Sequence, residues 1–452
     1  MDKIYDYFVD GFGNAIAQQN CGERRIGAEL KFPLVNSDGT AASFETVCVL
    51  WDYLGSNGWQ PVEDKMTGRV IGAKRKGQLN DTVAGCETGY CKTEFSLAHV
   101  GNLFNMEKQI NQLREELKPF CKESGVNFLC YGIQPVTPPS KKLMMKKART
   151  SPWVKAFGAN QHITENDGDD VHLFTINAAS HVHISTSLEE AVDAVNVLNG
   201  FSGPQIALTA NSNIWQNKID PDYKCVAEKF WDWWMPNSNR VGIPSKPFED
   251  IKDYVHTIAN FKPVYVTRNG KPIILKKYKT FDEYYKKGRA VGIDADGKEV
   301  SFTPEKSDID LHNSCYWYNA RISRYYTVEN RVNDQQPPDA LLCVSALTLG
   351  LISALAEAKE ELSSYDWQTL RQMRQIACQY GLHGRKDTIR LIRLALRMLI
   401  IARLGLLRRG LGEEKFLKPL EKRLCDFECP ADQAADLFRN GGVSMLVEEW
   451  KF

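Results

Sequence analysis

The sequence of 452 residues lacks the marks of a secreted, membrane-spanning or nucleic-acid-binding protein. Its opening residues, MDKIYDYFVD, are acidic rather than apolar, so we expect no signal peptide. The best candidate for a membrane span, residues 390–407, contains four arginines, which are costly in a bilayer. Its apolar residues recur at helical spacing, which predicts an amphipathic helix packed on a core. Because 57 basic residues balance 56 acidic ones, we expect a cytoplasmic protein without a nucleic-acid or membrane partner.

The twelve cysteines include no C-x-x-C pair. The closest spacings join Cys86 to Cys91 and Cys425 to Cys429. Without a secretory signal, scattered cysteines are most simply small buried side chains in a reducing compartment. Disulfides or a zinc site are the less favoured alternatives.

The order of predicted elements is mixed at first and helical at the end, with no internal repeat. Helices are expected at residues 1–20, at 43–58 with Gly58 as a C-cap, at 102–125, and from 188 onward with Ser187 as the N-cap. Strands are expected at residues 24–35, 70–78, 82–98, 127–135 and, as a strand or hairpin, 170–187. Residues 338–452 read as nearly all helical, with breaks at 380–385 and 425–433. We therefore expect a catalytic domain at 1–340 and a helical region at 341–452 packed on it.

Carboxylates occur on predicted strands, where they are unusual. Glu29, Glu94 and Glu329 each have apolar or aromatic neighbours, and Glu is seldom buried unless it is paired or bound to a cation. Glu87 precedes Glu94 across a predicted turn at Gly89, so both side chains can meet over a hairpin. Hard cations such as Mg²⁺ prefer oxygen ligands, often a few carboxylates together with substrate phosphates. For any single glutamate, the outward face of an alternating strand is the simpler interpretation; the four together favour a cation site.

Two histidines accompany these carboxylates. In the segment SHVHIST, His181 and His183 lie on the same side of a strand, because strand side chains alternate with a period of two. Zinc is a weak alternative without nearby cysteines or a third histidine. A neutral imidazole that joins carboxylates around a metal, or that bonds a phosphate, fits better.

The segment ARISRYYTVENRVNDQQPPD, residues 320–339, combines charges of both signs with apolar and aromatic residues. A solvated surface explains the charges but not the interleaved Ile322, Tyr325 and Val328. A strand that lines a charged site with one face and packs against the core with the other explains both.

In chain order, the segments GAELKF, CETGYCKTEFS, SHVHIS, ALTANSNIW, NSNRVGIP and the stretch at 320–339 resemble the glutamate–cysteine ligases. The resemblance is to the plant and proteobacterial branch and its carboxylate–amine ligase relatives, and it extends over roughly residues 20–360. It implies an α+β fold like that of glutamine synthetase, in which a curved antiparallel sheet flanked by helices forms a funnel. It also implies two or three Mg²⁺ ions, ATP as co-substrate, and glutamate activated as an acyl phosphate that an amine captures.

The same resemblance implies roles for individual residues. The implied metal ligands are Glu29, Glu87, Glu94, His181 and Glu329. The implied catalytic residues are Glu329 and Arg331, which form an E-x-R motif, and Arg240, which lies in a turn. The implied substrate and ATP contacts are Arg321, Arg324, Lys31, Lys229 and His183. Arginine suits these roles because its planar fork clamps carboxylates and phosphates.

The chain departs from the family pattern at three places. Lys31 stands where the family has a second glutamate, Lys229 where relatives have an arginine, and TGYC where relatives have a Gly-Gly loop. A protonated lysine cannot ligate a metal, so one ion is either missing or replaced by the Lys31 ammonium. These departures leave the metal count and the acceptor amine open.

Three functions follow from these patterns, all with small-molecule substrates. The first is a ligase that joins the γ-carboxylate of glutamate to cysteine. The second is the same chemistry with another amine or acid, which the tyrosine- and tryptophan-rich segment 315–326 favours. The third is a non-catalytic relative that binds nucleotide or glutamate and regulates a partner.

Overall fold

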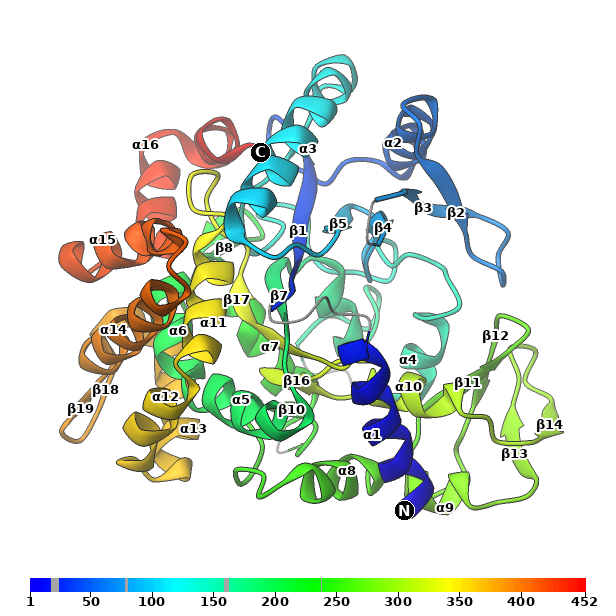
Figure 1. Cartoon of the computed structure of the whole chain (residues 1–452). Helices are drawn as coiled ribbons and strands as arrows, with labels where there is room; N and C mark the ends of the chain where they lie inside the picture. Colours follow the sequence, from blue (N-terminus) through cyan, green and yellow to red (C-terminus); the bar gives the residue numbers. More distant parts are fainter. Residues whose placement is uncertain (18–23, 78–79, 158–161, 237) are drawn as a thin grey trace.

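The computed structural model describes residues 1–17, 24–77, 80–157, 162–236 and 238–452 (Figure 1). Its centre is a large antiparallel sheet, to which a short strand, β6 (Val126–Phe128), adds by pairing with one end of β1. The other strands, in spatial order, are β16 (Ala320–Ile322), β17 (Thr327–Asp334), β7 (Ala179–Ser185), β1 (Ile26–Asn36), β5 (Lys92–Ser96), β4 (Thr82–Cys86), β3 (Val70–Arg75) and β2 (Gln60–Glu63).

Alternation along β1 explains how one sheet can be both core and site. Ala28, Leu30 and Phe32 are buried on one face of the strand. Glu29 and Lys31 lie on the opposite face, where they line a cavity. Successive side chains of a strand point to opposite faces, so the apolar and charged residues separate without any irregularity of the backbone.

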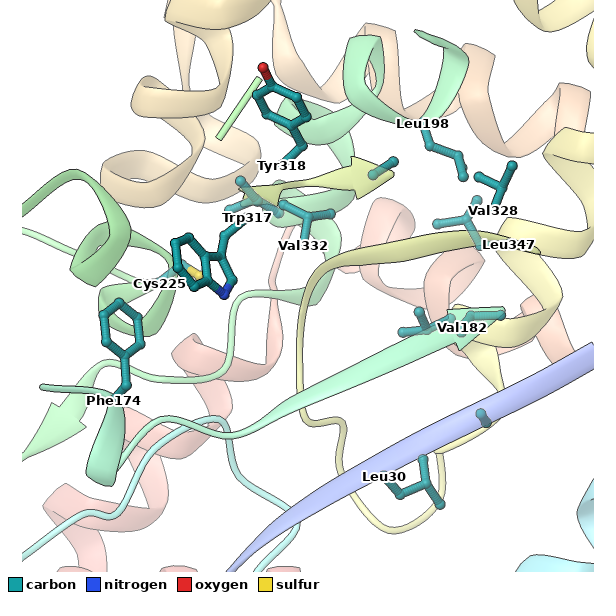
Figure 2. Close-up of a cluster of buried hydrophobic side chains, with 14 of the residues drawn as sticks. Leu30, Phe174, Val182, Leu198, Cys225, Trp317, Tyr318, Val328, Val332 and Leu347 are labelled. Carbon is teal, nitrogen blue, oxygen red and sulfur yellow. The ribbon is translucent and has the colours of Figure 1, made fainter. Parts of the chain in front are cut away.

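The apolar face of the sheet packs on helices. Figure 2 shows Leu30, Val182 and Val328 of the sheet with Leu198 of α5 (Leu188–Gly200) and Leu347 of α11 (Cys343–Ser353). All five side chains are buried. The helix α6 (Ser202–Thr209) packs on β17, and α14 (Leu391–Arg409) packs on α11 and α6 from outside. The sheet and the C-terminal helices thus share one core, while the division at residue 340 remains a prediction.

The remaining helices flank the sheet or follow it in the C-terminal part. They are α1 (Asp2–Ala17), α2 (Phe44–Ser56), α3 (Leu103–Ser124), α4 (Ser151–Ala156), α7 (Val226–Trp234), α8 (Ile251–Ala259), α9 (Phe281–Tyr285), α10 (Ser307–Asn313), α12 (Leu355–Ser363), α13 (Trp367–Tyr380), α15 (Lys418–Asp426), α16 (Pro430–Trp450) and the 3-10 helices η1 (Asp170–Thr175), η2 (Gly381–His383) and η3 (Glu413–Leu417).

Smaller sheets complete the fold. A four-stranded antiparallel sheet protrudes from the main body (Figure 1) and consists of β11 (Tyr265–Arg268), β12 (Lys271–Ile274), β13 (Ala290–Ile293) and β14 (Glu299–Phe302). Three two-stranded pairs are formed by β8 (Ile214–Trp215) with β9 (Lys218–Ile219), β10 (Val241–Gly242) with β15 (Trp317–Tyr318), and β18 (Arg385–Lys386) with β19 (Ile389–Arg390).

Several expected elements are confirmed. The helix expected at 102–125 is α3, which ends at Gly125 in the left-handed conformation. Ser187 caps α5 in a capping box with Glu190. Residues 82–98 form the strands β4 and β5, joined by a turn. The C-terminal quarter is helical, with breaks near residues 381–390 and 427–429.

Other expectations were wrong in detail. The strand expected at 127–135 ends at Phe128, because the following backbone bonds to scattered segments such as Pro33 and Asn211 instead of to one strand. The first part of 170–187 is the 3-10 helix η1, and only Ala179–Ser185 is a strand. The second helix has Asn57 as its C-cap, and the expected Gly58 follows directly with a φ of 86°, as a helix-terminating glycine does. The edge strand β2 was not predicted; its largely exposed sequence QPVE has no apolar alternation. The end of the first expected helix, residues 18–20, lies outside the described residues.

Within the described residues, no helix has the length and apolar character needed to cross a membrane. The cysteines of this part of the chain are all free thiols, and most are buried.

Candidate active site

The charged face of the sheet borders a cavity of about 1440 Å³. The strands β1, β5, β7, β16 and β17 contribute side chains to its wall, and α1, α4, α7 and η1 close it from other sides. The predicted carboxylates Glu29, Glu87, Glu94 and Glu329 all line this cavity. Strand registry brings them together, since Lys31 pairs with Glu94 and Glu329 pairs with His183.

Two carboxylates and two histidines form the centre of the cavity. Nδ1 of His181 lies 3.0 Å from Oε2 of Glu29 and 3.5 Å from Oε1 of Glu329. Nε2 of His183 lies 3.3 Å from Oε1 of Glu29. Both imidazoles therefore lie on the same face of β7, as the sequence predicted. In the part of the chain that the structure describes, one group fits a metal ion: ligand atoms of Glu29, His183 and Glu329 lie within 4.8 Å of one another.

Lys31 lies among the other carboxylates. Its Nζ donates to Oε2 of Glu29 at 2.8 Å, contacts Oε2 of Glu94, and lies 3.6 Å from Oε1 of Glu87. Oγ of Ser96 donates to the second oxygen of Glu94 at 2.8 Å. The space between these three carboxylates holds an ammonium, so it does not fit a metal ion while Lys31 is protonated. The residues thus fit one ion at the Glu29, His183 and Glu329 group and do not fit a second at Lys31.

Two arginines hold Glu329. Nε of Arg321 donates to Oε2 of Glu329 at 2.8 Å, and Arg331 pairs with Oε1. Arg321 also donates to the carbonyl oxygen of Tyr316 at 2.7 Å. A guanidinium has five N–H donors, so both arginines keep donors for an anionic ligand in the cavity they line.

The electrostatic environment sets the protonation of the centre. Burial, with the added effect of Lys31 and Arg331, lowers the pKa of His181 to about 3, so this imidazole is neutral. Burial also opposes protonation of His183, but the carboxylates of Glu29 and Glu329 outweigh it and raise the pKa of this imidazole. Burial raises the pKa of Glu94 to about 8, with a contribution from Glu29. Burial also opposes ionisation of Glu329, but the adjacent arginines outweigh it and hold the pKa of this carboxyl well below its usual range.

The structure does not bring every predicted residue to the cavity. The guanidinium of Arg240 donates to the carbonyl oxygens of Cys315 and Lys262 and lies over the ring of Phe261, away from the cavity wall. Lys229 bonds to Gln375 and Asp232 on the outer side of α7. These contacts are structural ones, so the geometry supports neither the catalytic role expected of Arg240 nor the substrate contact expected of Lys229. Arg324 does line the cavity, where it stacks on the exposed ring of Tyr325.

Residues that the sequence did not indicate also line the cavity. Lys92 is buried and donates to the carbonyl oxygen of Phe174 and to Asn177. Asp334 and Glu228 are buried carboxylates, and several tryptophans adjoin them. The available signals were the density of tryptophan in residues 231–234 and the aromatic segment 315–326, and both are equally typical of a core.

Comparison with known proteins decides the family. The model of glutamate–cysteine ligase family 2 matches residues 51–449, most of the chain. The chain belongs to this family. It is therefore an ATP-dependent carboxylate–amine ligase that acts on small molecules, with ATP as co-substrate. A divalent metal is typical of such ligases, and the Glu29, His183 and Glu329 group is the place in the described structure that fits one.

Solved structures support the fold of this ligase. The glutamate–cysteine ligase of Francisella tularensis, solved with AMP, is similar with a TM-score of 0.53 and 12% identity, covering 94% of this chain and 87% of that one. A bifunctional glutathione synthetase from Pasteurella multocida has a TM-score of 0.53 and 10% identity, covering 96% of this chain and 51% of that one. The chain thus spans about half the length of the second protein. No curated protein sequence matches the chain. The glutamine-synthetase-like α+β fold expected from the sequence is confirmed.

Proposed function

We propose that this ligase activates the γ-carboxylate of glutamate with ATP and joins it to a primary amine. Cysteine is the acceptor that the family description implies, and the product would then be γ-glutamylcysteine. The regulatory alternative is not favoured, because the cavity retains Glu29, Glu87, Glu94, His181, Glu329 and Arg331.

The observation that carries the proposal is the arrangement around Glu329. This buried carboxylate lies between Arg321 and Arg331 on one side and the metal-compatible group of Glu29 and His183 on the other. Phosphoryl transfer to a carboxylate brings two anions together, so a site for it needs cations that approach from more than one direction. Cationic donors and metal-compatible ligands meet here within one cavity.

The proposed reaction has two steps. A carboxylate oxygen of the acid attacks the γ-phosphorus of ATP, the bond to the β-phosphate oxygen breaks, and ADP leaves with the bonding electrons. The amine nitrogen then attacks the acyl carbon, the carbon–oxygen bond breaks, and phosphate leaves with its electron pair. The protons that the amine loses pass to carboxylates lining the cavity.

The residues have distinct parts in this scheme. Arg321 and Arg331 orient the anionic groups through their remaining N–H donors. Glu29, His183 and Glu329 would hold a divalent ion, which supplies charge neutralisation of the phosphates when bound. Lys31 supplies a further fixed positive charge beside Glu94.

Trapping with hydroxylamine tests the first step alone. Hydroxylamine is a small nucleophile that converts an acyl phosphate to a hydroxamate without occupying a specific acceptor site. With ATP, Mg²⁺ and L-glutamate, we expect γ-glutamyl hydroxamate and stoichiometric ADP, detected by mass spectrometry and a coupled assay. L-aspartate serves as the control acid. ADP release without any hydroxamate, or hydroxamate only from another acid, would show that glutamate is not the activated substrate.

A further inference from the structure

One end of the cavity is walled by aromatic rings from separate parts of the chain. We call these five side chains the aromatic pocket: Trp153 of α4, Phe174 of η1, Trp231 and Trp234 of α7, and Trp317 of β15. Figure 2 shows two of them, Phe174 and Trp317. The ring centroids of Phe174 and Trp231 lie 4.2 Å apart, and Trp231 stacks on Trp317 at 5.8 Å with an interplanar angle of 24°.

Most of these rings are buried against one another, but Trp231 is only half-buried. Its ring stacks on Phe174 and Trp317, and all three line the cavity. Rings packed in this way present a preformed apolar surface that needs little reorganisation to bind a ligand. A flat apolar group that enters this end of the cavity would contact several ring surfaces at once.

Buried polar atoms in the same wall have no hydrogen-bond partner within the described residues. They are Oδ1 of Asn319 and the indole Nε1 atoms of Trp153 and Trp234. Each residue is more than nine-tenths buried, and each lines the cavity. Buried polar groups of native proteins are nearly always paired, so unpaired ones that line a cavity indicate a ligand that completes them. The Oδ1 atom of Asn319 can only accept, which suits an N–H donor.

The buried carboxyl groups of Glu228 and Asp334 line this end of the cavity, and Arg149 lies there over the ring of Trp153. Glu228 is already paired with Arg374. Oδ2 of Asp334 accepts from the backbone N–H of Asn211 and from Ser212, and no ion pair reaches Asp334 within the described residues. Asp334 is therefore the carboxyl group at this end that can pair with an ammonium group when it is ionised.

The other end of the cavity is more suitable for the nucleotide. Arg25 and Arg324 line it, and the ring of Tyr325 there is 57% exposed. Arginines bind phosphates, and an exposed ring can stack on a base. The ring centroid of Tyr325 lies 6.4 Å from that of His183, so this end adjoins the metal-compatible group.

The aromatic pocket is close to the reacting centre. Trp317, Asn319 and Arg321 alternate along one segment, and all three line the cavity. The extended chain from Trp317 to Arg321 spans at most about 13 Å, because a strand rises about 3.3 Å per residue. The backbone N–H of Arg331 donates to the carbonyl oxygen of Asn319 at 2.8 Å, so an amine bound near Asn319 is next to Arg331 of the reacting centre, while its substituent rests on the rings.

We propose that the aromatic pocket is the acceptor site and that it takes a primary amine joined through a short chain to an aromatic ring. This proposal rests on the ligase function proposed above and names its second substrate. The side chain of cysteine has no ring that could pack against Trp231 and Phe174. Arylalkylamines and aromatic amino acids share the required chemistry, and the experiment distinguishes them.

The test is a panel of acceptors in the ADP-release assay with ATP, Mg²⁺ and L-glutamate. The panel contains cysteine, methylamine, phenethylamine, tryptamine and L-phenylalanine. We expect kcat/KM for the best aromatic amine to exceed that for cysteine and methylamine at least tenfold. A preference for phenethylamine over L-phenylalanine assigns an amine without a carboxylate, and the reverse preference assigns an aromatic amino acid. Cysteine as the best acceptor would overturn the proposal.

Variants of two tryptophans on one helix test where the acceptor binds. Trp231→Ala removes a ring of the pocket and should raise KM for the aromatic amine at least tenfold, with the KM for ATP unchanged. Trp231→Phe, which keeps a ring, should have a smaller effect. The matched control is Trp233→Ala, because Trp233 lies on the same helix but stacks on His162 outside the cavity wall. A rise in the KM for ATP in Trp231→Ala would show that the pocket holds the adenine ring instead.

Two further measurements separate failure of this proposal from failure of the ligase function. Hydroxamate formation from glutamate by the wild-type protein needs no acceptor amine, so it tests the ligase function separately from the acceptor proposal. Calorimetric titration of phenethylamine or L-phenylalanine into the protein, with glutamate and a non-hydrolysable ATP analogue present, measures acceptor binding without turnover. Normal hydroxamate formation with no aromatic binding would overturn the acceptor proposal alone. Aromatic binding that Trp231→Ala weakens, without hydroxamate, would support the pocket and contradict the ligase function.

Discussion

On β1, Nζ of Lys31 lies 2.8 Å from Oε2 of Glu29, so two side chains on one face of one strand form an ion pair inside the cavity. The same ammonium contacts Glu94 and lies 3.6 Å from Glu87. Three carboxylates around one position are typical of a cation site. In this chain the cation at that position is the ammonium group of Lys31. Because it belongs to a side chain, it cannot leave the site as a bound metal ion could.

Removing this ammonium should create a metal site. We expect Lys31→Met to bind one more Mn²⁺ per chain than the wild-type protein, because Glu29, Glu87 and Glu94 lose their shared cation and keep their oxygen ligands. Electron paramagnetic resonance of free Mn²⁺ during a titration counts the bound ions. The melting temperature of the variant should also fall in EDTA and recover with Mg²⁺.

The control for that experiment is Lys92→Met. Lys92 is equally buried on the adjacent strand β5, but it donates to a carbonyl oxygen and an amide and to no carboxylate. Its loss should lower stability without adding a metal. Equal Mn²⁺ stoichiometry in the wild-type and Lys31→Met proteins would mean that Lys31 does not stand in for an ion.

The part of the site that lies on strands could be predicted from the sequence. The period of two placed His181 and His183 on one face, and isolated glutamates in apolar strands indicated Glu29, Glu94 and Glu329. Local spacing is sufficient for such residues, because a strand fixes the direction of its side chains.

Residues whose positions depend on tertiary packing could not be predicted in this way. Arg240 was expected in the site from its turn motif, yet its guanidinium caps carbonyl oxygens of Cys315 and Lys262. The aromatic pocket is assembled from α4, η1, α7 and β15, which are far apart in the sequence. Only the packing of these elements shows which tryptophans of the chain face a cavity.

Glu329→Gln should lose activity and keep the fold. The substitution keeps the shape of the side chain but removes the charge that Arg321 and Arg331 share and one of the ligands of the metal-compatible group. We expect hydroxamate formation to fall by about 10²–10³, the size typical of losing one electrostatic group in an active site. Circular dichroism should show an unchanged secondary structure.

A matched variant for comparison is Glu190→Gln. Glu190 lies on α5, outside the cavity wall, and its carboxylate accepts two hydrogen bonds from the guanidinium of Arg24. It should retain wild-type hydroxamate rates. Activity within tenfold of wild type in Glu329→Gln would remove Glu329 from the catalytic group.

Alanine substitution should affect substrate binding at Arg331 and protein stability at Arg240. Arg331→Ala should raise the KM for ATP or for the acid at least tenfold, because its guanidinium lines the cavity. Arg240→Ala should leave both KM values within twofold and lower the free energy of unfolding, because hydrogen bonds from a charged group contribute about 1.5–3 kcal/mol. Steady-state kinetics and urea denaturation measure the two effects. A large rise in KM for folded Arg240→Ala would place Arg240 in the active site, as the family resemblance implied.

The pH dependence of the free energy of unfolding should reveal the raised pKa of Asp334. Burial raises the pKa of Asp334 to about 7, although hydrogen bonds from Asn211, Ser212 and Cys225 partly offset this effect. In the unfolded chain an aspartate has a pKa of about 3.9. Between these values the native protein binds the proton that the unfolded chain has lost, so this group's contribution to stability falls as pH rises from about 4 to 7.

Asp334→Asn removes the titration, since the amide oxygen can accept the same hydrogen bonds. We therefore expect the variant to gain stability relative to the wild-type protein between pH 5 and pH 8 in urea denaturation. A constant difference across this range would show that Asp334 is ionised throughout, and the cavity would then carry a full negative charge beside the aromatic pocket at every pH tested.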